Sequence, residues 1–86
     1  MTKLEKKLFE IASDKSGIDI EKIEMKSMFV DDLGCDSLDM IEMVMEIEDV
    51  FDIEFPDEDY EKIVTVQDAY DYLEQKVDVA YLSDAD

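Results

Sequence analysis

A serine at the predicted start of a helix is the side chain in this sequence best placed for covalent chemistry. Ser37 follows Gly34, Cys35 and Asp36, and an uninterrupted helical stretch begins at this point. A serine in this position commonly caps the helix. Alternatively, its hydroxyl carries a covalent group, because a phosphate there would lie near free backbone N–H groups and the positive end of the helix dipole. Gly34 would then permit a tight turn and a close approach.

The residue types that the sequence lacks exclude several catalytic classes. It has no histidine, which excludes Ser-His-Asp and Cys-His nucleophiles, histidine-ligated zinc and a histidine pH switch. It has no Gly-x-Ser-x-Gly elbow and no lysine near Ser37 in sequence, which excludes a serine hydrolase. One cysteine permits neither an internal disulfide nor a four-cysteine zinc site. We therefore expect no enzymatic activity, and a reactive Ser37 would need another enzyme to activate it.

Length and charge narrow the class of protein further. The 86 residues fit one domain, and an apolar share of 47% argues against disorder. Acidic residues number 26 against eight basic ones, and the net charge of −18 disfavours nucleic acid and anionic membranes as partners. It favours basic surfaces or cations. Since no apolar run is long enough to span a membrane and no signal core is evident, we expect a cytoplasmic monomer.

Helical periodicity predicts the elements that precede Ser37. Apolar residues recur at helical spacing from Leu4 to Ala12, Thr2 can cap this helix, and Gly17 supplies its end. The stretch 18–36 lacks a clear period and is expected to form a long loop with a short helical turn inside it. The apolar residues expected to anchor this loop are Ile18, Ile23, Phe29, Val30 and Leu33.

Two further helices and a short one are predicted after the loop. The second helix should begin at Asp36 or Ser37 and run to about Phe51, with Asp36 as its cap. Pro56 then opens a short helical turn, and Thr65 caps a final helix. The apolar face of that final helix comprises Val66, Ala69, Tyr70, Leu73 and Val77.

These elements predict an all-α fold, a small four-helix bundle of three longer helices and one short helix. A long loop separates the first and second helices. The whole chain, 1–86, is expected to be one domain with its core in about 3–76. Residues 77–86 form a C-terminal extension that either lengthens the last helix or frays.

The helix predicted over 37–51 carries more apolar surface than one core face needs. On a helical wheel one apolar group lies within about 100°, namely Met40, Met43, Val44, Ile47 and Phe51. A second stripe, Leu38, Ile41 and Met45, lies outside that arc and is bordered by Glu42, Glu48 and Asp49. The second stripe either packs against the loop or the third helix, or it stays exposed as a protein-binding face. For Leu38 and Met45 we expect partial exposure.

The acidic residues are concentrated in the middle of the chain. Fourteen acids and no base lie between Ser27 and Glu61, which are bracketed by Lys26 and Lys62. Such a run of acids either keeps one face of the protein solvated or steers a basic partner towards it. The carboxylates also repel one another. We expect the carboxylates of 46–59 to bind divalent cations weakly, without the loop of an EF-hand.

The residues around Ser37 resemble the attachment motif of acyl carrier proteins, which begins the second helix in that family. The motif reads Leu33-Gly34-Cys35-Asp36-Ser37-Leu38-Asp39. The likeness to bacterial type II fatty-acid carriers continues through 42–48, 51–58 and 61–69, and covers roughly residues 3 to 76. Two side chains depart from the pattern, because Cys35 replaces a smaller apolar residue and Met40 is bulkier than usual. The segment after Lys76 has no counterpart in the resemblance.

The resemblance implies a carrier with a covalent cofactor. Ser37 would be esterified with 4′-phosphopantetheine from coenzyme A by a separate Mg-dependent phosphopantetheinyl transferase, with Asp36 and Leu38 completing the motif. The thiol of the arm would carry growing acyl chains between fatty acid synthesis enzymes, which would dock through basic patches. The partner-recognition positions of the family map onto Leu38, Ile41, Glu42, Met45, Glu48 and Asp49. Polyketide, peptidyl or D-alanyl cargo on the same scaffold is the alternative, followed by an unmodified acidic interaction or cation-buffer protein.

Methionine-rich packing beside the serine indicates where an acyl chain could be sheltered. Methionine side chains adapt their shape, so such packing can open for an apolar guest. Without a guest, the same side chains are ordinary core. The candidate walls are Met40, Met43, Val44, Ile47, Phe51, Ile63, Ala69 and Tyr72.

Overall fold

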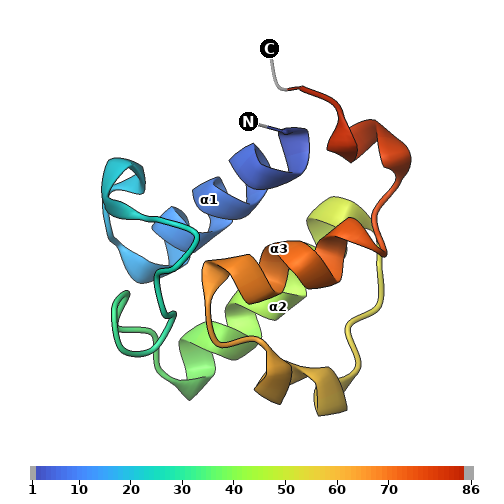
Figure 1. Cartoon of the computed structure of the whole chain (residues 1–86). Coiled ribbons are helices and arrows are strands. Elements are labelled where there is room, and N and C mark those ends of the chain that lie inside the picture. Colours follow the sequence, from blue (N-terminus) through green and yellow to red (C-terminus); the bar gives the residue numbers. More distant parts are fainter. Residues whose placement is uncertain (1, 85–86) are drawn as a thin grey trace.

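A computed structural model describes residues 2–84 and contains three α-helices joined by short 3-10 helices (Figure 1). The α-helices are α1 (Lys3–Ser16), α2 (Ser37–Phe51) and α3 (Val66–Glu74). The 3-10 helices are η1 (Ile20–Lys22), η2 (Asp57–Lys62) and η3 (Val79–Leu82). Within residues 2–84 no strand forms. The predicted all-α bundle with three longer helices is confirmed, η2 is the predicted short helix, and η3 was not predicted.

The helix ends follow from the local sequence. The Thr2 hydroxyl accepts a hydrogen bond from the Glu5 amide at 3.1 Å, and Gly17 ends α1 in the left-handed conformation at φ 75°. At the start of α3, Thr65 and Asp68 each accept a hydrogen bond from the backbone N–H of the other. The predicted caps of both helices are therefore confirmed.

The last α-helix is shorter than predicted. α3 ends at Glu74, and the Leu73 carbonyl accepts hydrogen bonds at 2.9 Å from the amides of both Lys76 and Val77. The bond from Lys76 spans three residues and the bond from Val77 spans four, and no regular helical bonding follows them. The helix therefore ends in a turn, and Val77 lies beyond it. Its side chain still packs against the core.

The core lies where the three helices and the loop between α1 and α2 meet. Its largest fully buried side chains are Leu4, Leu8, Phe29, Met43, Val66 and Leu73. Three of the predicted loop anchors, Ile23, Phe29 and Leu33, are buried as expected. Val30 is not an anchor, because its side chain is 59% exposed.

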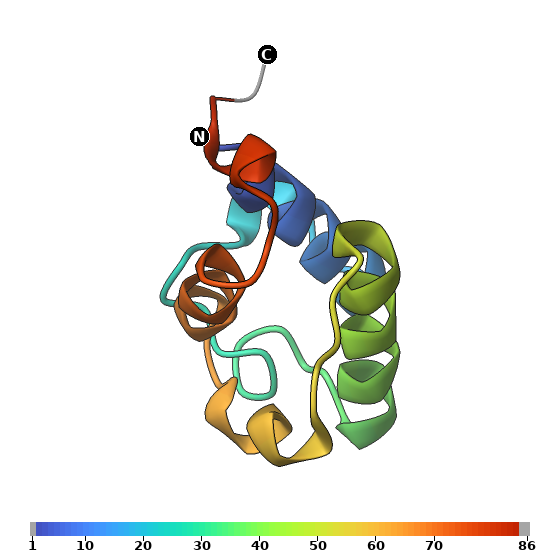
Figure 2. The same ribbon diagram turned by 90° about the vertical axis from the view of Figure 1, so that its right-hand side faces the viewer.

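Backbone hydrogen bonds fasten this loop to the start of α3. The Phe29 amide donates to the Val64 carbonyl at 3.0 Å, and the Val66 amide donates to the Ser27 carbonyl at 3.0 Å. Figure 2 shows the segment before α2 running between α2 and α3, which lie on opposite sides of that view. The loop that leads into α2 is therefore attached to the start of α3.

The segment after α3 does not lengthen that helix. It turns back, forms η3, and lies beside the start of α1, so that both ends of the described chain meet (Figures 1 and 2). In residues 2–84 there is no helix with the length and apolar character needed to cross a bilayer.

Candidate functional site

Ser37 is the first residue of α2, and Asp36 caps the helix in its place. Asp36 Oδ1 accepts from the Asp39 amide at 2.9 Å, and Asp39 Oδ2 accepts from the Asp36 amide at 3.2 Å. The predicted cap at Asp36 is confirmed, and Asp39 completes a reciprocal capping box with it. Among residues 2–84 the Ser37 hydroxyl has no hydrogen-bond partner, and the residue is exposed. The hydroxyl is therefore available for another role.

The first turn of α2 leaves two backbone N–H groups free for a phosphate, while the carboxylates of Asp36 and Asp39 beside them oppose negative charge. In the described part of the chain, the amides of Ser37 and Leu38 have no acceptor. Such free N–H groups lie at the positive end of the helix dipole and suit a phosphate. Gly34 adopts φ 72°, which a side chain would strain, but no atom lies within 4 Å of where its Cβ would be. Gly34 is thus needed for its backbone angle and not for a close approach.

A tight turn places Ser37 at the entrance of the helix. Over 28–35, the Val30 carbonyl accepts from the Gly34 amide at 3.1 Å and the Phe29 carbonyl accepts from the Cys35 amide at 2.9 Å. Phe29 is itself buried. The turn therefore links the buried Phe29 to the first residues of α2 and restricts their movement.

Cys35 is a packing residue beside the site. Its side chain is 2% exposed, and burial raises the pKa of its thiol, followed by the negative charges of Asp39 and Asp36. A thiol that keeps its proton is a poor nucleophile. Cys35 therefore fills space in the core beside the site.

The second apolar stripe of α2 faces solvent. Leu38, Ile41 and Met45 are 63%, 44% and 57% exposed. The partial exposure predicted for Leu38 and Met45 is confirmed, and Ile41, which the sequence left undecided, shares it. Of the acidic border, Glu42 and Asp49 are exposed and Glu48 is half-buried. The arrangement is an apolar strip with carboxylates at its edge, which we call the docking face.

Glu48 has a second contact that the sequence did not reveal. Its Oε2 accepts a hydrogen bond at 3.0 Å from the amide of Phe55. Its carbonyl also accepts from the amides of Asp52 and Ile53. Glu48 therefore holds the turn that follows α2, which is a role that helical periodicity cannot indicate because the acceptor and donor lie on different elements.

A hollow of about 640 Å³ opens beside Ser37. Most of its side chains are apolar, and they come from the turn before α2, from α2 itself, and from η2 and its end. The lining residues are Val30, Cys35, Asp36, Ser37, Met40, Ile41, Val44, Tyr60, Glu61 and Ile63. Three of the predicted wall residues, Met40, Val44 and Ile63, are among them. Val30 and Tyr60 were missed, because only the fold brings them to α2.

The other five predicted wall residues do not line this hollow. Four of them are buried in the core, namely Met43, Ile47, Phe51 and Ala69. Tyr72 instead belongs to an aromatic cluster between η2 and α3. The burial of these four residues agrees with the expectation that, without a guest, the candidate walls are ordinary core.

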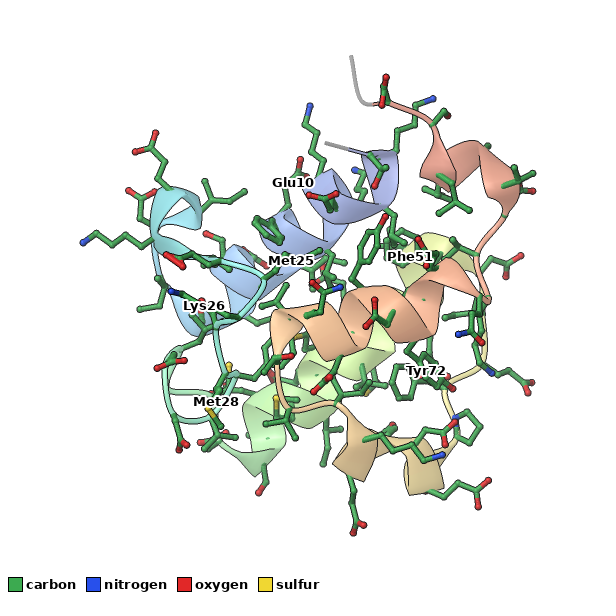
Figure 3. All side chains as sticks on the ribbon, in the orientation of Figure 1. Glu10, Met25, Lys26, Met28, Phe51 and Tyr72 are labelled. Carbon is green, nitrogen blue, oxygen red and sulfur yellow. The ribbon has the colours of Figure 1, made fainter. Side chains whose placement is uncertain are left out.

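The aromatic cluster fixes η2, one wall of the hollow. The rings of Phe55 and Tyr72 stack at 4.4 Å, and Tyr60 meets Phe55 edge-on at 5.5 Å. Tyr72, labelled in Figure 3, donates its hydroxyl to Asp59 Oδ2 at 2.7 Å. Burial, and then this bond to a carboxylate, raise the pKa of Tyr72 to about 12. The cluster thus links η2 to α3 behind the hollow.

Comparisons with known proteins agree on one family. Residues 6–73 match a family model described as "Phosphopantetheine attachment site". An acyl carrier protein of Bdellovibrio bacteriovorus is 50% identical over 70 residues, which are 81% of this chain and 90% of that protein. An acyl carrier protein of Chlorobium phaeobacteroides is 48% identical over 73 residues, 85% of this chain and 94% of that protein. A third, from Chlorobium phaeovibrioides, is 50% identical over 70 residues, with 81% and 90% covered.

Proposed function

Because this chain belongs to the acyl carrier protein family, we propose that it carries growing acyl chains as thioesters on an arm attached to Ser37. Members of this family are carriers and not enzymes, and their cofactor is phosphopantetheine. The arm supplies a thiol at the end of a long flexible tether, which raises the effective concentration of the cargo at each partner enzyme.

The proposal for Ser37 rests on one observation. Its hydroxyl is exposed and unbonded at the first turn of α2, while Asp36 does the capping that a serine in this place would otherwise do. The residues present fit the phosphate end of the arm, since the Ser37 and Leu38 amides are free to receive it. In the attachment step Ser37 Oγ bonds to the phosphorus that carries pantetheine, the pyrophosphate P–O bond of coenzyme A breaks, and adenosine 3′,5′-bisphosphate leaves. In residues 2–84 no side chain is hydrogen-bonded to the Ser37 hydroxyl, so we assign the removal of its proton to the transferase.

Intact mass spectrometry tests this attachment. After incubation with a phosphopantetheinyl transferase, Mg²⁺ and coenzyme A, the protein should gain the mass of one phosphopantetheine group. Ser37→Ala should gain nothing, and Ser83→Ala, which changes another exposed serine, should gain as much as the unmodified sequence. A gain that survives Ser37→Ala would move the arm to another residue.

The docking face supports weak and reversible binding of enzymes with basic patches. Its three apolar side chains provide contact area, and Glu42, Glu48 and Asp49 provide the charge that steers a basic partner. Such an encounter weakens as salt screens the charges. We expect Met45→Ala and Glu42→Ala to weaken binding to the transferase, measured by calorimetry, and raised salt to reduce the difference between Glu42→Ala and the unchanged protein.

The hollow beside Ser37 supports an apolar cargo. Its side walls combine methionine, valine and isoleucine, and each methylene buried there stabilises the complex by about 0.8 kcal/mol. The four predicted wall residues that lie in the core would line the path only if the packing opens further. Loading the arm with a medium-length acyl chain should shift the NMR signals of Met40, Val44 and Ile63 relative to the unloaded arm. Unchanged signals at all three residues would show that the acyl chain does not bind in the hollow.

Fatty acid synthesis is the pathway we propose, with the cytoplasm as the location and a monomer as the working form. The similarity to bacterial acyl carrier proteins over most of the chain supports fatty acyl cargo over polyketide, peptidyl or D-alanyl cargo. The apolar lining of the hollow supports the same choice, since a peptidyl cargo would leave polar groups without partners there.

A further inference from the structure

We propose that residues 77–84 form a strap that joins α1 to α2 at the end of α2 opposite Ser37, and so stabilises the folded carrier. The match to the family model ends at residue 73, before this segment begins. The strap contacts neither Ser37 nor the docking face through any described hydrogen bond, and its role is separate from the proposed function.

Backbone contacts fasten the strap to the start of α1. The Lys3 amide donates to the Ser83 carbonyl at 3.0 Å, and Thr2 pairs with Asp84 as an antiparallel bridge. Figures 1 and 2 both place η3 beside the first turn of α1. The Lys3 amide is one of the first N–H groups of a helix, which have no acceptor inside the helix. The strap supplies that acceptor.

Side-chain contacts fasten the same strap to the end of α2. The ring of Tyr81 meets Phe51 edge-on, with centroids 5.0 Å apart and planes at 78°. Its hydroxyl donates to the Val50 carbonyl at 3.3 Å. The carbonyls of a last helical turn lack partners inside the helix, and this turn holds no basic side chain that could supply a donor. Tyr81 takes that place, and Leu82 packs beside it against the core.

The charge of the molecule explains why such a strap matters. A net charge of −18 on 86 residues opposes compaction. The strap adds an aromatic contact and backbone bonds, none of which depends on a cation. We therefore expect the contribution of these contacts to persist at low and at high salt, while the total stability is lowest at low salt, where the repulsion between carboxylates is least screened.

Thermal unfolding at low salt with a chelator tests the strap. Tyr81→Ala should lower the Tm by about 10 °C, and Tyr81→Phe, which keeps the ring and removes the donor, by a smaller amount. Truncation after Lys76 should lower it at least as far as Tyr81→Ala. Val79→Ala is the matched control, because Val79 lies in the same 3-10 helix and is 77% exposed. It should leave the Tm unchanged within 2 °C or so.

Hydrogen exchange gives a second readout that needs no truncated protein. The Lys3 amide should be protected in the full chain and should lose most of that protection in Tyr81→Ala. The proposal fails if Tyr81→Ala and Val79→Ala have the same Tm. It also fails if the Lys3 amide exchanges freely in the full chain. Folded Tyr81→Ala should still gain phosphopantetheine at the rate of the unchanged protein. If neither Tyr81→Ala nor the unchanged protein gains this mass, the result counts against the proposed function and not against the strap.

Discussion

At the scale of single residues, neighbouring carboxylates in this protein have different tasks. Asp36 and Asp39 close the entrance of α2 and leave the Ser37 hydroxyl free. Glu48 belongs to the docking face by position, yet its carboxylate is engaged with the amide of Phe55. Glu42, one and a half turns earlier, is exposed. Removing the negative charge should therefore affect stability at Glu48 and not at Glu42.

Substitutions at Glu48 should separate its structural bond from its charge. Glu48→Ala leaves the half-buried Phe55 amide without an acceptor and should lower the free energy of unfolding by about 1–3 kcal/mol. Glu48→Gln keeps an oxygen acceptor and should cost less than half as much. Glu42→Ala should change stability by no more than about 0.5 kcal/mol. Urea unfolding measures all three, and equal stability of Glu48→Ala and Glu42→Ala would contradict the structural role.

Cys35 should make the stability fall as the pH rises above the ordinary range of a thiol. Its folded pKa is raised by burial and by Asp39 and Asp36, so the unfolded thiol ionises first. Below the unfolded pKa of roughly 8.5 both states hold the proton, and Cys35 adds no pH dependence. Above it, ionisation of the thiol stabilises the unfolded state, so the free energy of unfolding falls until the folded thiol also ionises.

The comparison with Cys35→Ala isolates this effect, because every tyrosine titrates alike in both proteins. Between pH 8 and pH 10, the free energy of unfolding should fall further for the protein that keeps Cys35 than for Cys35→Ala. Both proteins should carry Ser37→Ala so that no arm thiol interferes. A difference that stays constant over this range would mean that the folded thiol ionises as easily as the unfolded one.

At the scale of elements, the end of α2 is less well formed than its start. Asp52 lies after the last turn with φ 55° and ψ 53°, a left-handed conformation that strains most side chains. Its negative charge also faces the negative end of the helix dipole, and the last turn contains no base to offset it. The start, by contrast, has a complete capping box.

Replacing Asp52 with glycine should stabilise the protein. Glycine removes the left-handed strain and the unfavourable charge together, and we expect a gain of about 1 kcal/mol in urea unfolding. Asp52→Asn removes only the charge and should give a smaller gain that shrinks as salt is added. If Asp52→Gly unfolds at the same or a lower urea concentration, then a contact of the aspartate outweighs both effects.

At the scale of the whole molecule, charge works against folding. Residues 2–84 contain four ion pairs, each with at least one partly exposed side chain, and such pairs contribute little. The most enclosed of them joins Lys15 on α1 to Glu46 on α2 at 3.7 Å. The other acids remain unpaired by lysine in the part that the structure describes. Compactness therefore depends on the core, the caps and the contacts of the C-terminal segment.

Divalent cations should raise the melting temperature gradually. In residues 2–84 no group of three or more potential metal ligands comes together, so Mg²⁺ should act by weak, distributed binding and screening. We expect the Tm to rise over millimolar Mg²⁺, and by more than in NaCl of equal ionic strength. An unchanged melting curve would contradict the repulsion argument, and saturation at one equivalent would indicate a specific site.

The sequence by itself determined the features that depend on neighbours along the chain. The caps at Thr2, Asp36 and Thr65, the stop at Gly17 and the two stripes of α2 follow from hydrogen bonds and periodicity within a few residues. Family resemblance added the proposed role of Ser37, and comparison supports the family to which the chain belongs.

Only the tertiary structure decided which distant residues meet. Val30 and Tyr60 come from separate segments to line the hollow with α2. Phe55 reaches the end of α2 from the segment that follows it, and Tyr81 reaches it from η3. The physical reason is that such contacts depend on how packed elements are oriented, which periodicity within one segment does not specify.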